Sequence, residues 1–335
     1  MLTFTLRRLL LAIPTLLVIS LVIFLLVDLA PGSPMSEIPL TVPPDVRQKM
    51  IAALGADQPV FVRYFLWLRQ FFWVEPATVI DGWFGTNLAG DEQRILSWQS
   101  RSPVFTIIGQ RVPQTLTVIG TAYLVGILIA VPIGIYSAYR QYSWFDQAGT
   151  LFAMIGFSVP TFFSGTLFII IFAVLLGWFP TKYDTTLVVT DWASFVKQVK
   201  QMTLPVMTLG LANAAAISRY MRSSMLENMS QDYVRTARAK GMSERTVVLK
   251  HVLRNSMIPV VTVIALGIPS IFGGAIITEN LFGVNGIGAA LIGAIHSNDI
   301  PMVQTLAFIF AILIVVFNLI ADVLYGFLDP RIRYD

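Results

Sequence analysis

Six stretches of the chain are long and apolar enough, or nearly so, to cross a lipid bilayer, and they limit the fold more than any other feature. A spanning helix needs about 20 apolar residues to cross a hydrocarbon layer of about 30 Å. The stretches are 9–29, 116–138, 150–179, 202–218, 257–278 and 303–328. Charged residues make up only 13% of the chain, which is too few for the surface of a soluble protein. We therefore expect an all-α integral membrane protein with six transmembrane helices.

Two of these stretches differ from a simple spanning helix. The stretch 150–179 carries no charge, but it is long and contains Pro160. Proline removes a backbone hydrogen bond and clashes with the preceding turn, so we expect a kink or a break there. The stretch 202–218 is the shortest and the weakest, and it contains the polar residue Asn213.

The distribution of basic residues predicts that both termini are cytoplasmic, because Lys and Arg are more frequent in cytoplasmic loops. With that orientation, 13 of the 23 Lys and Arg residues lie in the cytoplasmic pieces 1–8, 139–148, 219–257 and 329–335. The other ten lie in the outside connections 30–112 and 179–201, and the third outside connection, 279–302, has none. The net charge of +4 is small, so we expect the basic residues to set topology and not to bind nucleic acid.

The outside connection 30–112 has 83 residues and must carry structure of its own. Pro43 and Asp45 can begin a helix that Gly55 ends. Four tryptophans are scattered through the rest, which indicates that parts of the segment lie against the membrane interface: Trp67, Trp73, Trp83 and Trp98. A passive cap on the helices and a docking surface for an external partner fit this sequence equally well.

The cytoplasmic stretch 219–257 has an unusual composition. It contains eight basic and three acidic residues, no proline, and the single glycine Gly241. Strong helix formers surround that glycine, so the sequence predicts two short helices that bend near Gly241 and lie parallel to the membrane. A basic amphipathic loop that rests on anionic lipid is one interpretation of this stretch.

The sequence contains no recognisable catalytic site. A phosphate-binding loop requires Gly-x4-Gly-Lys-Ser/Thr, and the dipeptide Gly-Lys does not occur in the chain. The two histidines, His251 and His296, fall in loops, so neither lies at the depth that an intramembrane serine protease requires. The chain has no cysteine, which excludes thiolate metal sites. We expect no catalytic, cofactor-binding or metal site.

Ionisable residues are rare in the apolar stretches, where they are costly and often mark a transport pathway. Asp322 lies about two turns from the inner end of the last stretch, and a structural hydrogen bond is favoured there over contact with substrate or protons. The polar residues that could line a pathway or join helices are Asn213, Glu279, Asn318 and Asp322. An ion-gradient-driven secondary transporter would need more such groups at mid-membrane, so a pathway powered from elsewhere is the favoured interpretation.

The segment 232–255, DYVRTARAKGMSERTVVLKHVLRN, resembles the EAA loop of ABC-transporter permeases, in the form found in the peptide/nickel importer branch. The family motif is Glu-Ala-Ala, three residues and then Gly, and here Arg235, Thr236 and Ala237 precede Gly241 at that spacing. Further similar segments follow in the family's order: APGSP (30–34), LGADQP (54–59), RVPQTL (111–116), FSVPTF (157–162), GWFP (177–180), SRYMRSSMLE (218–227), GGAIITENLFGVNGIG (273–288) and NLIADVLYGFLDPRIR (318–333). One segment, DGWFGTN (81–87), departs from the family's Gly-Asp-Leu-Gly-x-Ser.

The resemblance implies a type I ABC importer permease bundle in the bacterial inner membrane. Its parts would be the N-terminus with the first helix (1–29), an extracytoplasmic domain (30–112), the permease core (113–328) and a cytoplasmic C-terminus (329–335). The implied partners are a homologous second permease subunit, two cytosolic ATPase subunits that use ATP, an extracytoplasmic substrate-binding protein and the lipid bilayer. Di- and oligopeptides are the first candidates for the substrate, while nickel chelates and certain oligosaccharides remain open.

The resemblance also implies a coupling helix that seats in a groove of an ATPase subunit. Its residues would be Arg235, Thr236, Ala237, Arg238, Ala239, Lys240 and Gly241. The small residues Ala237, Ala239 and Gly241 would allow close seating. The arginines and Lys240 would pair with acidic groups or carbonyls of the ATPase.

Overall fold

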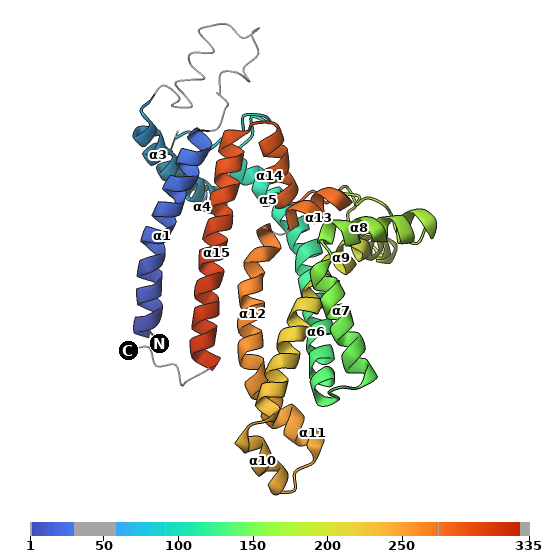
Figure 1. Ribbon diagram of the computed structural model, residues 1–335. Helices are drawn as coiled ribbons and strands as arrows, with labels where there is room; N and C mark the ends of the chain where they lie inside the picture. The colour runs from blue at the N-terminus through green and yellow to red at the C-terminus, as the bar shows by residue number, and fades with distance from the viewer. Residues whose placement is uncertain (1, 30–57, 91, 274, 329–335) are drawn as a thin grey trace. The chain divides into compact units, whose positions relative to one another are not determined.

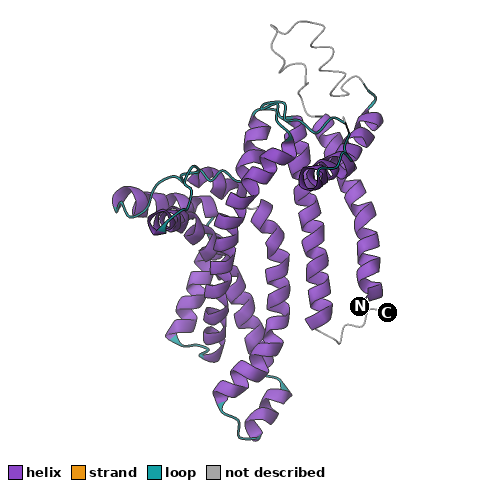
Figure 2. Ribbon diagram, turned by 180° about the vertical axis from the view of Figure 1, so that it is seen from behind, coloured by secondary structure: helices purple, strands orange, loops and turns teal. Residues whose placement is uncertain are grey.

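The computed structural model describes residues 2–29, 58–90, 92–273 and 275–328 (Figure 1). All of the regular structure in this part of the chain is helical (Figure 2), which confirms the all-α prediction. The helix expected between Pro43 and Gly55 lies outside the described residues. The chain packs as two compact units, unit 1 with residues 1–10, 113–289 and 313–335, and unit 2 with residues 11–112 and 290–312.

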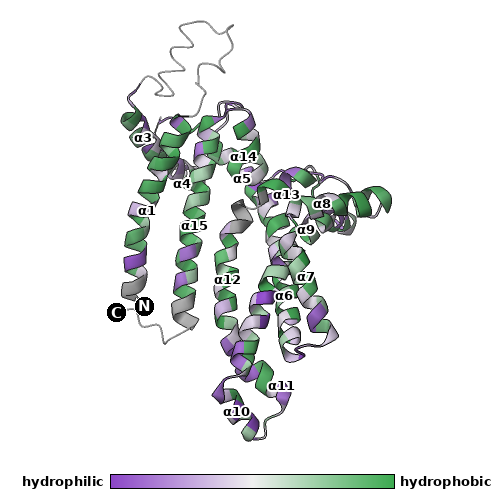
Figure 3. Ribbon diagram, viewed as in Figure 1, coloured by the Kyte–Doolittle hydropathy of each residue, from purple (hydrophilic) through white to green (hydrophobic). Residues whose placement is uncertain are grey.

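Four helices within the described ranges are long and apolar enough to cross a membrane, and up to six spans result if each of two bent helix pairs counts as one. The four are Thr5–Asp28, Val104–Tyr139, Glu244–Pro269 and Ile300–Leu324. The first lies in α1 (Leu2–Asp28) and the last in α15 (Ile300–Leu328). The second consists of α5 (Val104–Thr115), the π-helical turn η2 (Leu116–Gly120) and α6 (Thr121–Tyr139). The third consists of α11 (Glu244–Thr246), η4 (Val247–Val252) and α12 (Leu253–Gly273). Figure 3 shows that α15 is largely hydrophobic, whereas hydrophilic residues gather on α10 and α11.

The first bent pair confirms the break that Pro160 predicts. Helix α7 (Trp144–Ser158) is followed by α8 (Thr161–Phe168) and η3 (Ile169–Leu175), and the two directions differ by 105°. Val159 is extended, with φ −87° and ψ 121°. This conformation follows from the proline ring, which disfavours the helical region for the residue before it. Pro160 thus ends α7, and α8 starts in a new direction (Figure 1).

The second bent pair consists of α13 (Ala275–Phe282) and α14 (Ile287–His296), which differ in direction by 88°. Gly283 lies at the turn with φ 71°, a left-handed conformation that glycine adopts without strain. The single stretch expected over 257–278 is therefore divided. Its first part belongs to the helix that begins at Glu244, and its last residues belong to α13.

Helix α9 (Trp192–Met229) is 38 residues long and extends beyond the expected stretch 202–218 at both ends. It begins at a capping box in which the Asp191 carboxylate accepts a hydrogen bond from the Ser194 backbone N–H at 2.7 Å. The expected loop 179–201 is therefore helical from Trp192. The expected loop 219–257 likewise begins eleven residues too early, because residues 219–229 continue α9.

Helices α6 and α9 pack closely through small residues within unit 1. A Cβ atom on Gly134 would lie 2.5 Å from the Met221 Cβ, and one on Gly126 would lie 2.9 Å from the Gly210 carbonyl oxygen. No side chain fits at either glycine, so the two backbones approach each other directly. Small residues at such crossings are characteristic of helices that pack in a membrane.

Unit 2 has an aromatic core that the sequence analysis did not foresee. Three helical segments follow one another here, α3 (Val60–Arg69), η1 (Gln70–Val74) and α4 (Glu75–Phe84). Trp67 is buried, and its ring lies 5.2 Å from that of Phe308 and 5.8 Å from that of Phe71. Trp67 itself therefore belongs to the core of the unit and is not one of the rings that could meet the membrane interface.

Candidate functional site

The loop that resembles the EAA element forms two short helical segments joined at Gly241. Helix α10 (Asp232–Ala239) has an acidic residue in its first turn and Arg238 in its last, which suits the helix dipole. Gly241 has φ 75° and donates its N–H to the Arg238 carbonyl at 2.9 Å, which ends α10 in a left-handed turn. Ser243 then caps α11 by accepting a hydrogen bond from the Thr246 N–H at 3.4 Å. These features confirm the predicted bend at Gly241.

One face of this loop is buried against its own chain. Val234 and Ala237 of α10 pack in a core cluster with Met221 and Met225 of α9 and with the valines of η4, Val247, Val248 and Val252. Only 5% of Ala237 is exposed. Ala237 is therefore buried within its own chain and does not offer a partner the small surface for close seating that the resemblance implies. Its small side chain is required by packing inside the chain.

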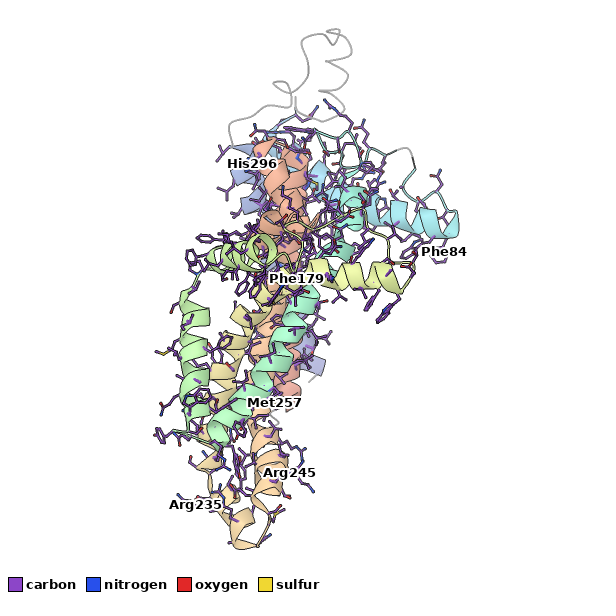
Figure 4. All side chains as sticks on the ribbon, turned by 90° about the vertical axis from the view of Figure 1, so that its right-hand side faces the viewer. Phe84, Phe179, Arg235, Arg245, Met257 and His296 are labelled. Carbon is purple, nitrogen blue, oxygen red and sulfur yellow. The ribbon has the colours of Figure 1, made fainter. Side chains whose placement is uncertain are left out.

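The other residues of the element, Arg235, Thr236, Arg238, Ala239, Lys240 and Gly241, are exposed. A Cβ atom on Gly241 would meet nothing within 4 Å, so glycine is needed there for its backbone conformation and not for lack of space. Figure 4 shows Arg235 and Arg245 on different sides of the helical hairpin. The exposed side of the hairpin is therefore basic, and its opposite side, which packs against α9 and η4, is apolar.

An ion pair closes the hairpin across the bend. Arg238 donates two hydrogen bonds to Glu244, from Nη2 at 2.7 Å and from Nε at 3.1 Å. These bonds raise the pKa of the Arg238 guanidinium. Part of the hydrogen-bonding capacity of Arg238 is therefore used within the chain. The sequence alone indicates this pair only weakly, because it shows no more than two opposite charges, Arg238 and Glu244, on either side of the Gly241 turn.

Glu279 is the most deeply buried of the polar residues singled out in the sequence, with none of its surface exposed. Its carboxylate accepts hydrogen bonds from the Thr115 hydroxyl at 2.6 Å and from the Ala289 N–H at 2.9 Å. The Thr115 hydroxyl oxygen in turn accepts from the Ile287 N–H at 2.9 Å. A Cβ atom on Gly286 would overlap the carboxylate. These contacts fix the turn between α13 and α14.

The other three polar residues have different surroundings. Asn213 lies half-buried on α9, where it faces α6 near Gly126, and Asn318 is exposed on α15. Asp322 accepts from Arg8 Nη1 at 2.8 Å, an ion pair between α15 and α1. This contact supports the structural interpretation of Asp322 over a pathway role.

A buried ion pair that the sequence analysis did not identify lies near the start of α7. Arg222 of α9 forms two hydrogen bonds to Asp146, which is almost fully buried. The two residues are 76 positions apart, and no local pattern in the sequence joins them. A second arginine of the same helix end, Arg219, lies 4.7 Å from the centre of the Phe157 ring. Both arginines therefore stabilise the contact between α9 and α7.

The described side chains contain no group of three or more His, Cys, Asp or Glu residues that could hold a metal ion. Among the polar residues described above, Glu279, Asp322, Asp146 and Arg238 are joined to other side chains or to backbone groups. The arrangement leaves an exposed basic surface on the hairpin above a packed apolar interior.

Comparison with known proteins gives matches along nearly the whole chain. Residues 130–334 match the family model for the binding-protein-dependent transport system inner membrane component, and residues 1–119 match the model for its N-terminal part. The chain is 36% identical over 338 residues to the oligopeptide transport system permease protein AppB of Bacillus subtilis, and the match covers 100% of both chains.

Two further relatives have similar names and lengths. The glutathione transport system permease protein GsiC of Salmonella typhimurium is 38% identical with 100% of both chains covered, and a putative peptide permease protein of Brucella suis is 37% identical with 99% of both covered. A crystal structure of an amino acid ABC transporter with histidines covers 66% of this chain and 94% of its own, at 13% identity and a TM-score of 0.48.

Proposed function

The chain belongs to the family of binding-protein-dependent transport system inner membrane components, and we propose that it is a permease subunit of an ATP-driven importer for di- and oligopeptides. The observation that carries this proposal is the full-length similarity to permeases named for oligopeptides, peptides and glutathione. In this role the chain forms half of the translocation pathway. The few charges in its apolar helices suit a cavity that passes on cargo selected by another protein.

The proposed partners follow from the family description and from what this chain lacks. A homologous second permease completes the pathway, and an extracytoplasmic binding protein delivers the substrate. Two cytosolic ATPases bind and hydrolyse ATP, because this sequence has no Gly-x4-Gly-Lys-Ser/Thr loop for phosphate. No cofactor is assigned to this chain.

The proposed topology has six transmembrane helices in a bacterial inner membrane with both termini in the cytoplasm. The spans lie in α1, in η2 with α6, in α7–α8, in α9, in α12 and in α15, and the α13–α14 turn is an outside connection. The close packing of α9 on α6 supports its inclusion. Residues 1–29 form the N-terminus and first span, 30–112 the extracytoplasmic domain, 113–328 the core and 329–335 the C-terminus.

The proposed coupling surface is the exposed side of α10 and the turn at Gly241. Arg235 and Lys240 are placed to pair with acidic groups or carbonyls of an ATPase, while Val234 and Ala237 hold the hairpin to α9 and η4. Closure of the ATPases around ATP then moves this hairpin. That movement would switch the bundle between inward and outward access.

Reconstitution of the complex in proteoliposomes tests the proposal. Uptake of labelled peptides should require the binding protein, both ATPases and ATP, and it should persist when an ionophore removes the ion gradient. Parallel assays with glutathione and a nickel chelate define the substrate class. Uptake that continues without ATP and stops with the ionophore would instead identify an ion-gradient-driven secondary transporter.

A further inference from the structure

Segments α3, η1 and α4 follow one another without a break from Val60 to Phe84, and they expose a series of aromatic rings. Phe61, Phe65 and Phe72 are spaced four and seven residues apart, which places them on one side of a helix. Their exposed fractions are 67%, 66% and 52%. Three further rings are exposed toward the end of the segment: Trp73, Trp83 and Phe84. The opposite side packs into the aromatic core around Trp67.

The first turns of this segment are fixed to the C-terminal end of α1, within unit 2. The hydroxyls of Ser20 and Tyr64 lie 2.8 Å apart, and the rings of Phe24 and Tyr64 are 5.4 Å apart. Arg63 Nη2 lies 2.7 Å from Asp28 Oδ1. Asp28 ends an apolar run of more than 20 residues, so this ion pair marks the level at which the hydrocarbon layer ends along α1.

The last part of the segment, α4, runs across the direction of α1. In Figure 4 the helix that ends at Phe84 extends sideways, whereas α1 is upright in Figure 1, and both belong to unit 2. A helix that runs across a spanning helix lies along the plane of the membrane, and Figure 1 shows α4 beside the upper part of α1. The apolar surface of α1 is exposed up to this end of the helix, since Leu26 and Leu29 are exposed by 64% and 81%.

We propose that the helix from Val60 to Phe84 lies in the headgroup layer of the leaflet at the C-terminal end of α1, with its exposed rings among the lipids. Aromatic side chains are enriched at this depth, and a helix with one apolar face lies in the plane of the interface. Six exposed rings on one segment would be unfavourable for a domain that faced only solvent. The lipid contact is independent of the transport function proposed above.

Site-directed spin labelling in the bilayer tests this contact. The chain has no cysteine, so Phe61→Cys, Phe65→Cys, Phe72→Cys and Phe84→Cys each place one label in this subunit. The complete complex is reconstituted in nanodiscs of phosphatidylcholine and phosphatidylglycerol, and power saturation compares contact with oxygen and with a nickel chelate. At all four positions, oxygen contact should exceed nickel-chelate contact, because each label replaces a ring that reaches below the headgroups toward the acyl chains. Gln93→Cys, at an exposed polar position of the same unit, is the matched control and should show the reverse order.

Two results would overturn the proposal. Labels at Phe65 and Phe72 that meet the nickel chelate more readily than oxygen would place the face in water. Labels that become immobile and shielded only when the substrate-binding protein is added would identify a protein partner. Only variants that elute as a single complex and retain ATP-driven uptake are measured. Phe84 lies 20 residues after Tyr64, which contacts α1, so Phe84→Cys keeps the test available if the other variants misfold.

Discussion

The guanidinium of Arg222 donates two hydrogen bonds to the carboxylate of Asp146, from Nε at 2.6 Å and from Nη2 at 2.8 Å. The same carboxylate accepts the Tyr142 N–H at 2.9 Å. Tyr142 has φ 64°, a left-handed conformation that a bulky residue rarely adopts. The pair therefore joins the end of α9 to a strained turn between α6 and α7, and α9 leads directly into the basic hairpin.

Removal of either partner should destabilise the subunit. We expect Asp146→Ala to cost about 3 kcal/mol, because the Arg222 charge stays partly buried without its partner. Arg222→Ala should have an effect of similar size. The double variant should be more stable than the sum of the two single effects predicts. Thermal unfolding of the purified complex measures this. Single variants as stable as the wild type would show that the ion pair is not stabilising.

Substitution of Gly241 should separate backbone conformation from surface contact. Gly241→Ala should cost about 1–2 kcal/mol because of the positive φ, and Gly241→Asn should cost less. Gly241→Trp should lose the same stability as Gly241→Ala from the positive φ, and its ring should project into open space. We expect only Gly241→Trp to prevent co-purification of the ATPases. The coupling assignment is wrong if this variant retains the ATPases and uptake while neutralisation of Arg235, Arg238 and Lys240 abolishes both.

Ala237 and Ala239 form a matched pair on the two sides of α10. Ala237→Glu places a carboxylate in the apolar cluster and should destabilise the subunit by roughly 2 kcal/mol or more. Ala239→Glu lies on the exposed side and should change stability by no more than about 0.5 kcal/mol. It should nevertheless weaken binding to an acidic ATPase groove. Thermal stability and ATPase co-purification are measured for both, and equal stability of the two variants would contradict the buried position of Ala237.

Glu279→Gln should destabilise the turn between α13 and α14 by about 1–3 kcal/mol. The amide cannot replace both carboxylate oxygens, because Thr115 and Ala289 each donate a hydrogen to one of them. Gly286→Ala should have a comparable effect, because the new Cβ overlaps the Glu279 carboxylate. Glu279→Asp, whose side chain is shorter, should partly restore the stability of the Gly286→Ala variant. Asn280→Ala, at an exposed neighbour, is the control. Thermal unfolding that is unchanged in Glu279→Gln would rule out this role.

The subunit purified alone should hydrolyse no ATP, because its sequence has no loop that binds phosphate. Phosphate release is measured with and without added ATPase subunits. Turnover by the single subunit, at a rate that contaminating ATPases do not explain, would contradict the proposed division of labour.

Features set by a single residue's backbone chemistry were predicted from the sequence. Pro160 predicted the break between α7 and α8, and Gly241 predicted the bend of the hairpin. Both effects depend on the residue itself and its immediate neighbours. The apolar stretches likewise indicated spanning helices, although their ends were misplaced at α9, where polar residues continue the helix beyond the apolar part.

Features that depend on distant neighbours were not predicted. Trp67 and Ala237 are buried because Phe308 and the valines of η4 pack against them, and neither contact follows from local spacing. The pair of Asp146 and Arg222 joins positions 76 apart. Such contacts are fixed by the tertiary structure, which a single sequence does not specify residue by residue.

The apolar cluster beneath α10 has an energetic consequence for any partner of the hairpin. Val234, Ala237 and Val247 already hold the two short helices in one arrangement within the free subunit. A protein that docks there does not have to order a flexible loop, so less of its binding energy is lost to conformational entropy. Truncation of Val247, which is fully buried in the free subunit, should therefore weaken the association by restoring disorder to the unbound state.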